Sequence, residues 1–437
     1  MHTKSRAPAL GPFIVLGVLG LFPAVRAAGQ AAAPAAPPQN PPARVTLDEA
    51  IDLALKHNHS LQAARTMILQ NHAQEITANL RPNPVFLIDE QYMPFFSPHA
   101  FTSDYIDQTA VYDLGASYLI ERGKKRQRRF EAAKDQTSVT SAQVTDNERT
   151  LTFNVAAQFI SALLAQANVD LADTDLKSFQ QTVEISEERT KAGAMSEGDL
   201  LKIKLQMLQF QTDVSAARLA RIQALASLRQ LLGYDSVPEK YEVVGDLEYK
   251  PVTLGKDDLK ALALRTRPDL RAAQLGVTAA QSQLSLAQAN AKKDLGVTFT
   301  YNHLGGVNTG SLFFNIQMPI FDRNQGEIAR TRYAITQSQE LSSEQASIAL
   351  TDVENSYEGL RTNDEVMRLY QSGYLKESED SRDISQYAYQ RGAASLLDFL
   401  DAERSYRATE LAYRQALAGY MISLEQLRQS VGTRSLP

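Results

Sequence analysis

The chain of 437 residues contains no cysteine, no tryptophan and only six histidines. Without cysteine it has no disulfide, no thiolate metal ligand, no cysteine nucleophile and no cysteine that could carry a lipid anchor. Its net charge of −5 gives no excess of positive charge that would indicate nucleic-acid binding. No Ser/His/Asp set, phosphate-binding loop or cluster of metal ligands stands out. We therefore expect neither an enzyme nor a bound metal or cofactor.

Long apolar runs are also scarce. The one N-terminal run, Phe13–Phe22, follows the basic residues Lys4 and Arg6 and precedes the small-residue site around Ala27, which predicts a signal peptide over residues 1–27. An Ala/Pro-rich leader over residues 28–44 should lack a core of its own. After the signal peptide no apolar run approaches the ~20 residues of a transmembrane helix. A membrane-crossing part would therefore have to be closed β-structure.

The chain repeats itself. Residues 45–234 and 257–431 each read as two short helices, two strands and a long helical hairpin, with a Pro- and Gly-containing linker at 235–256 and a tail at 432–437. Between Lys124 and Ala192, and again from Gln325 to Arg391, only helix-compatible residues occur. Each stretch predicts a rod of about 100 Å at 1.5 Å per residue. The fold class is thus mainly helical, with a small β part.

Four short segments show the period-two alternation of strands with one apolar face. They are Val85–Met93, Val111–Ile120, Leu295–Asn302 and a segment in which Leu312, Phe314, Ile316, Met318 and Ile320 are in phase. Gly305 and Gly306 predict the turn of the second pair. Such strands are long enough to cross a bilayer when tilted, but four strands cannot close a barrel. The chain should therefore oligomerise.

Three motifs, in this order, resemble TolC-family outer membrane efflux proteins. They are Leu-x-x-Ala-x-x-x-Ala-Leu from Leu47, the Phe-Asp-Arg-Asn-Gln-Gly sequence from Phe321, which is most similar to the cobalt–zinc–cadmium efflux branch, and Tyr-x-x-Gly-x-x-Ser-Leu-Leu-Asp from Tyr389. The resemblance covers 45–431. It implies a homotrimer in the outer membrane, with a twelve-stranded transmembrane β-barrel continued by a periplasmic α-barrel. It also implies two protein partners, a periplasmic adaptor (membrane fusion protein) and an inner-membrane pump that is proton-driven.

The two hairpin turns are candidate contact sites. Gly193 and Gly392 fit left-handed caps that end a helix, and Ser196 and Ser395 fit the caps that begin the next one. The resemblance implies that these turns form the periplasmic tips that meet the adaptor.

Four side chains are candidates for a gate. Asp398 and Asp401 stand at i and i+3 on one helix face, and three copies would form two carboxylate rings of the kind that selects cations. Helix-capping acids are the simpler reading, which explains Asp398 better than Asp401. By resemblance, Tyr389 and Asp199 hydrogen-bond across helices to keep the entrance shut. Ala394 stands where many drug-exporting members have an arginine, so that salt bridge is missing.

Two further motifs favour ordinary readings. His57 and His59 stand at a helix end without a third ligand nearby in the sequence, which favours a helix terminus over a metal site. The basic run Lys124–Arg129 stands at a strand-to-helix junction of an exported chain, which favours a solvated helix start near anionic headgroups over a nucleic-acid site.

The function that these patterns indicate is a passive outer membrane channel for heavy-metal cations or small toxic compounds. Two alternatives remain open at this point: the channel of a type I protein secretion system, and a soluble periplasmic coiled-coil adaptor. The sequence names neither the cargo nor the pump.

Overall fold

The computed structural model describes residues 43–436, so the predicted signal peptide and most of the predicted leader lie outside the described part. The first half runs β1 (Ala43–Val45), α1 (Leu47–His57), α2 (His59–Ala78), β2 (Val85–Gln91), a 3₁₀ turn at Pro98–Ala100, α3 (Ser103–Gln108), β3 (Val111–Ile120), α4 (Lys125–Lys191) and α5 (Glu197–Leu232). The second half runs β4 (Tyr241–Val243), α6 (Lys256–Thr266), α7 (Pro268–Asn290), β5 (Leu295–Leu304), β6 (Val307–Ile316), α8 (Gln325–Leu369), a π-turn at Tyr370–Tyr374, α9 (Leu375–Gln390) and α10 (Leu396–Val431). The chain is mostly helical with few strands, as expected.

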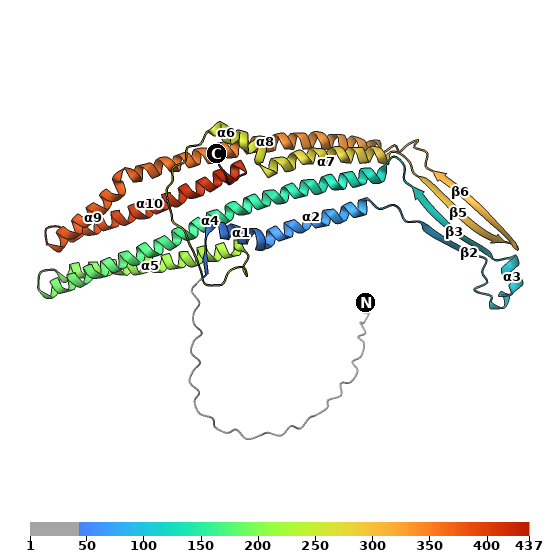
Figure 1. Ribbon diagram of the computed structural model, residues 1–437. Helices are drawn as coiled ribbons and strands as arrows, with labels where there is room; N and C mark the ends of the chain where they lie inside the picture. The colour runs from blue at the N-terminus through green and yellow to red at the C-terminus, as the bar shows by residue number, and fades with distance from the viewer. Residues whose placement is uncertain (1–42, 437) are drawn as a thin grey trace, which may run out of the picture. The chain divides into compact units, whose positions relative to one another are not determined.

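The elements have the same side-by-side order in three successive parts of the molecule: the sheet, the helices that join it, and the long hairpins (Figure 1). The sheet has the order β2-β3-β5-β6. The helices that join it pack in the order α2-α4-α7-α8, and the paired long hairpins pack in the order α5-α4-α10-α9. Elements of the first repeat therefore form one edge at every level, and elements of the second repeat form the other. A single layer with two open edges results.

The antiparallel register sorts the sheet into two faces. Ile88 pairs with Leu114 and Leu114 with Tyr301, while Phe86, Ala116, Phe299 and Leu312 form the next row of the same apolar face. On the opposite face, Asp89 pairs with Asp113, Asp113 with Asn302 and Asn302 with Thr309. Because side chains alternate along each strand, this register gathers the in-phase apolar residues of all four strands on one side, while Leu87 and Phe313 lie on the other. Gly305 and Gly306, with φ of 58° and 73°, form the two-residue turn expected there.

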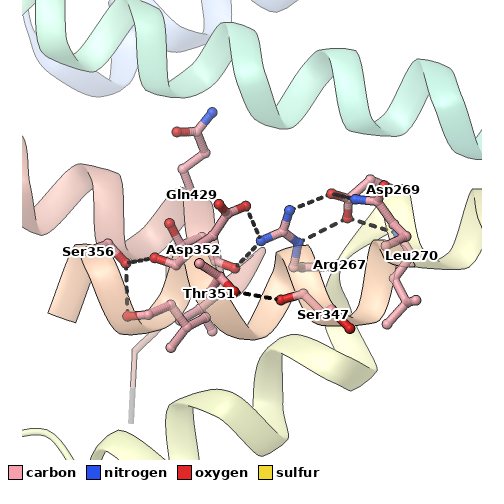
Figure 2. A network of polar contacts seen from close by, with 12 residues as sticks. Arg267, Asp269, Leu270, Ser347, Thr351, Asp352, Ser356 and Gln429 are labelled. Atoms are coloured by element: carbon pink, nitrogen blue, oxygen red, sulfur yellow. Dashed lines mark hydrogen bonds and ion pairs between the residues drawn. The ribbon is translucent and has the colours of Figure 1, made fainter. Parts of the chain in front are cut away.

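Each of the two predicted repeats contains the same kind of joint. At the α1–α2 bend the Asn58 amide donates to the Leu231 carbonyl at the end of α5, at 3.0 Å. At the α6–α7 bend Arg267 donates to the Ser430 carbonyl at the end of α10, at 3.2 Å. Arg267 is buried and also pairs with Asp269 and Asp352, as Figure 2 shows. Each repeat thus closes its short helices onto the end of its own hairpin.

A glycine makes each joint possible. Gly233 and Gly432 end α5 and α10 with φ of 90° and 86°, and a Cβ built on Gly233 would lie 2.6 Å from the His57 carbonyl oxygen. No other residue type tolerates both this backbone conformation and this close approach. Separate apolar clusters fill the two repeats beside these joints, one around Ile51, Phe159 and Leu228 and one around Leu259, Met367 and Tyr420.

The prediction of an unbroken second rod from Gln325 to Arg391 is wrong. The first long helix, α4, is continuous for 67 residues, or about 100 Å. The second is interrupted at Tyr370–Tyr374, where Gly373 takes a φ of 122° that lies outside the helical region. A single glycine within a helical pattern does not by itself predict a break, because an α-helix tolerates it at a cost of about 1 kcal/mol.

Three local features also differ from expectation. Met318 and Ile320 lie beyond the end of β6 at Ile316, since the prolyl nitrogen of Pro319 has no N–H to donate to a ladder. The loop between β2 and β3 contains the short helix α3. Ala43 and Arg44, expected in the leader, form a strand that pairs in parallel with β4 inside the expected linker.

One helix of the described residues, α4, contains an 18-residue window apolar enough to cross a membrane, with a mean hydropathy of 1.3. Half of that window is buried against other parts of the chain. The window therefore reads as the core of the helical layer.

Candidate functional site: the paired hairpin tips

The tips of the two hairpins have the same local geometry. Gly193 and Gly392 take φ of 73° and 75°, and in each turn the following N–H returns to the helix, from Ala194 to the Arg189 carbonyl and from Ala393 to the Ala388 carbonyl. Such left-handed caps end helices with little steric cost only at glycine or asparagine. A Cβ on Gly193 would contact nothing within 4 Å, so this turn projects into open space.

Ser196 and Ser395 begin the returning helices as predicted. The Ser196 hydroxyl accepts the Asp199 N–H at 3.1 Å and donates to its carboxylate at 2.8 Å. Ser395 and Asp398 form the full capping box, in which the Asp398 carboxylate also accepts the Ser395 N–H at 3.2 Å. Bonds from Lys202 and Ser196 lower the pKa of Asp199. Both acids therefore point back to their own helix starts.

Asp401 is the outward-facing member of the predicted carboxylate pair. Its side chain is 66% exposed and its only ion-pair partner among residues 43–436 is Arg404, one turn on, at 3.4 Å. Exposed pairs of this kind are weak. Asp401 is therefore available to line an opening, whereas Asp398 also serves its helix cap.

The expected Tyr389–Asp199 hydrogen bond is absent within the chain. The Tyr389 hydroxyl donates instead to the Met195 sulfur at 3.7 Å, and its ring stacks on Phe399 with centroids 5.3 Å apart. The Asp199 carboxylate is already held by Ser196 and Lys202. Ser196 and Lys202 thus satisfy the Asp199 carboxylate. Tyr389 belongs instead to an apolar contact between the two hairpins, which we call the seam.

That seam joins the two hairpins just above the tips. Phe179 of α4 stacks on Phe210 of α5 at 4.5 Å and faces Phe399 of α10 at 6.4 Å. Arg189 closes the seam at the tip, since its guanidinium donates to the Tyr389 carbonyl at 3.0 Å. The sequence did not single out these residues, because aromatic residues at helical spacing indicate a core without naming its partners.

A charged cluster lies on the other side of the seam. Arg407 of α10 binds Asp175 of α4 and Asp213 of α5, and its guanidinium lies over the Phe210 ring at 4.2 Å. Seven residues on, Arg414 donates to the Ala167 carbonyl of α4 at 2.7 Å. The seven-residue spacing of these two arginines was the signal available in the sequence. It places both on the face of α10 that meets α4.

The remaining sequence motifs do not form a site of their own. Among residues 43–436 no group of three or more His, Asp or Glu side chains is arranged to hold a metal ion. In the basic run, Lys125 pairs with Asp294 at 2.7 Å and Arg129 with Glu121 at 2.6 Å. What this arrangement can do is mechanical and electrostatic: it can hold two hairpin tips together beside exposed carboxylates.

Comparison with known proteins gives one consistent result. The family described as "Outer membrane efflux protein" matches residues 50–234 and 259–433. The chain is 24% identical over 408 residues to the pyoverdine export outer membrane protein OpmQ of Pseudomonas putida, covering 88% of this chain and 84% of that one. It is 23% identical over 374 residues to the cobalt-zinc-cadmium resistance protein CzcC of Cupriavidus metallidurans, covering 84% and 85%. The structure resembles that of the CmeC outer membrane channel of Campylobacter jejuni, with a TM-score of 0.73, 17% identity and coverage of 88% and 85%.

Proposed function

Because the chain belongs to the outer membrane efflux protein family, we propose that it is the outer membrane component of a tripartite efflux system and that three copies form one continuous tube. The family makes it an outer membrane efflux channel, and its relatives are channel proteins rather than enzymes. In this proposal the channel conducts passively what a proton-driven inner-membrane pump and a periplasmic adaptor deliver to the hairpin tips.

The observation that carries the trimer is the shared lateral order of the three levels. Within residues 43–436, the edge strands β2 and β6 each lack a neighbour on one side. Because β2 and β6 run in opposite directions, β6 of one copy can pair antiparallel with β2 of the next. Three copies of four strands then give the twelve-stranded barrel. Strands of 10 residues tilted by about 45° span roughly 24 Å, which suits the apolar band of an outer membrane.

The helical edges support the same closure. On α5 the apolar residues Leu201, Leu205, Leu208, Leu219 and Ile222 follow heptad spacing, interrupted by Thr212 and Ser215, and each is more than half exposed in a single copy. On the opposite edge, Leu369, Tyr374, Ile384 and Tyr387 of the α8–α9 region are exposed as well. Apolar stripes at this spacing are stabilised by packing against another helix. A head-to-tail ring would bury both.

The test changes the α5 stripe. Leu208→Asp with Ile222→Asp should reduce the yield of heat-resistant trimers in outer membrane fractions, because each copy would bury two charges at the new contact. The matched control, Gln206→Asp with Ala220→Asp, adds the same charges two positions earlier, off the face that carries the stripe, and should assemble normally. A detergent-free monomer of the unmodified protein in the periplasm would contradict the proposal.

The cargo is proposed to be heavy-metal cations or small toxic compounds. The relatives differ in the cargo that their names state, pyoverdine in one case and cobalt, zinc and cadmium in the other. Deleting the gene should lower resistance to one such compound and leave secreted proteins unchanged. Loss of a secreted protein with unchanged resistance would favour type I secretion instead.

A further inference from the structure

We propose that the four strand–helix junctions form a binding surface for anionic phospholipid headgroups of the periplasmic leaflet. The inference rests on the proposed trimeric barrel, which places the sheet in the outer membrane. All four junctions lie at the same end of the sheet, because β2 and β5 start there and β3 and β6 end there. The side chains of the four junctions therefore lie together in one belt at this end of the sheet.

Every junction carries an exposed cation that has no carboxylate partner within residues 43–436. Arg81 lies between α2 and β2, Arg122 and Lys124 between β3 and α4, Lys292 between α7 and β5, and Arg323 between β6 and α8. None of the five forms an ion pair in the described part of the chain, although ion pairs are frequent elsewhere on the helices. Three copies would bring fifteen such cations into one ring.

The acids at this level are already neutralised. Glu121 binds Arg129, and Asp294 binds Lys125 and the Arg122 N–H. Asp322 lies 3.4 Å from Lys293 and accepts the Asn324 N–H. The junction carboxylates thus have local partners, and the five remaining cations constitute a net positive surface.

The rest of the sheet region has no lysine or arginine to compete with the junction cations. Residues 85–120 and 295–316 contain no lysine or arginine, and their acids are Asp89, Glu90, Asp104, Asp107 and Asp113. The positive charge of the sheet region is therefore confined to the end where the helices begin. This asymmetry distinguishes the belt from a surface with scattered charges of both signs.

Two helix starts add to the positive potential of the belt. Lys124 and Asn324 immediately precede α4 and α8, both have a left-handed φ of about 60°, and neither side chain caps its helix. Backbone N–H groups of an uncapped first turn favour phosphate oxygens. The belt thus combines side-chain and main-chain donors that fit a phosphodiester.

Exposed apolar residues adjoin the cations on the side of the sheet. Ile120 and Ile316 end their strands on the apolar face, and Phe321 in the β6–α8 loop is 90% exposed. An amphipathic boundary of this kind suits a lipid, whose acyl chain lies against the apolar face while its headgroup meets the cations. A soluble anion would contact only the cations and not the apolar residues beside them.

The experiment uses purified trimers reconstituted in vesicles of equal parts phosphatidylglycerol and phosphatidylethanolamine, followed by native mass spectrometry of the lipids that stay bound. Phosphatidylglycerol should be enriched, and high salt should weaken the enrichment because it screens the charges. Since one cation near an anionic surface changes partitioning roughly fivefold, removing several should abolish the preference. The test variant combines Arg81→Ser, Arg122→Ser, Lys124→Ser, Lys292→Ser and Arg323→Ser.

The matched control removes five exposed cations that also lack a carboxylate partner in residues 43–436 but lie away from the junctions. It combines Arg44→Ser, Lys177→Ser, Lys240→Ser, Arg265→Ser and Lys376→Ser. It should keep the enrichment. If the five-site junction variant fails to assemble, the double variant Lys124→Ser with Lys292→Ser replaces it. The enrichment of phosphatidylglycerol is then measured for this variant and for the unmodified protein as the salt concentration is raised.

The outcomes separate this inference from the proposed function. Inserted trimers without a preference for phosphatidylglycerol, or with equal loss in both variants, would overturn the lipid surface and leave the channel standing. Unmodified protein that does not form inserted trimers would overturn the proposed function itself.

Discussion

The guanidinium of Arg407 in α10 holds the buried carboxylate of Asp175 in α4, with Nε 3.1 Å from Oδ2. The two residues are 232 positions apart in the chain and belong to different repeats. A second bond, 2.7 Å from Nη2 to Asp213 of α5, ties both helices of the first hairpin to the second. Arg407 is thus the ion-pair centre of the contact between the hairpins.

Arg407→Ala should destabilise the helical layer by about 3 kcal/mol, because it removes the ion-pair partner of the buried Asp175. The midpoint of thermal unfolding of the detergent-solubilised protein measures this. Arg404→Ala is the control, since Arg404 is 74% exposed and its pair with Asp401 should contribute less than about 1 kcal/mol. Equal effects of the two changes would show that Arg407 does not hold the seam.

Glu403→Gln should stabilise the packed hairpins at neutral pH. Burial raises the pKa of Glu403, the Asp175 charge raises it further, and Arg382 and Arg407 only partly offset this. A carboxyl whose folded pKa lies above its unfolded value stabilises the folded state at low pH, and this stabilisation is lost as pH rises through the folded pKa. Burial raises the pKa of Asp175 as well, so both groups act in the same direction.

The measurement is the unfolding midpoint as pH rises from the ordinary glutamate pKa to neutrality. Over this range the midpoint of Glu403→Gln should rise relative to that of the unmodified protein. Glu377→Gln, an exposed change on α9, should follow the unmodified curve. A lower midpoint for Glu403→Gln at neutral pH would contradict the prediction.

Gly373→Ala should destabilise the protein by more than about 1 kcal/mol, because alanine is strained at the φ of 122° that the π-turn requires. Gly359→Ala, on the regular part of α8 with open space around the new Cβ, should be neutral or stabilising. Chemical denaturation of both variants decides the point. If both glycines tolerate alanine equally, the break between α8 and α9 is not a fixed feature.

Asp398→Asn with Asp401→Asn should reduce cation selectivity and block by multivalent cations in planar-bilayer conductance. Asparagine is chosen over alanine because its side-chain oxygen at position 398 can still accept the Ser395 N–H of the capping box. The start of α10 is therefore retained. Glu377→Gln with Asp380→Asn, two exposed changes on α9, serves as the control because it removes the same number of charges. Unchanged selectivity in the double variant would leave both acids as ordinary helix-start residues.

Tyr389→Phe, added to that pair, should enlarge single-channel conductance only if the hydroxyl holds the entrance shut in the assembled trimer. Among the described residues of one chain, the hydroxyl bonds only the Met195 sulfur, which is a weak acceptor. We therefore expect a small effect on stability. A large loss of stability would mean that Tyr389 has a stronger partner in a neighbouring copy.

Gly193→Trp or Gly392→Trp should abolish export, because a bulky side chain at a left-handed turn both strains the tip and obstructs the adaptor. Gly193→Asn and Gly392→Asn are the matched controls, since asparagine tolerates this conformation and should keep export. Trimers should form in all four variants, since the barrel lies about 100 Å away by helix rise. Normal export by both tryptophan variants would show that the tips do not meet the adaptor.

The sequence by itself determined the local elements. Alternating side chains in Val111–Ile120 specified a strand with one apolar face, and the glycine–serine pairs at 193–196 and 392–395 specified where the hairpins turn. These features depend on backbone sterics and on hydrogen bonds between residues a few positions apart, which the sequence displays directly.

The tertiary structure alone decided which distant groups meet. It gave Tyr389 the sulfur of Met195 instead of Asp199, joined Arg407 to Asp175, and broke the second rod at Gly373. It also collected at one end of the sheet cations that lie far apart in the chain. Partner choice and net charge at a surface depend on packing in three dimensions, because a side chain's local spacing fixes its face of a helix but not what lies opposite that face.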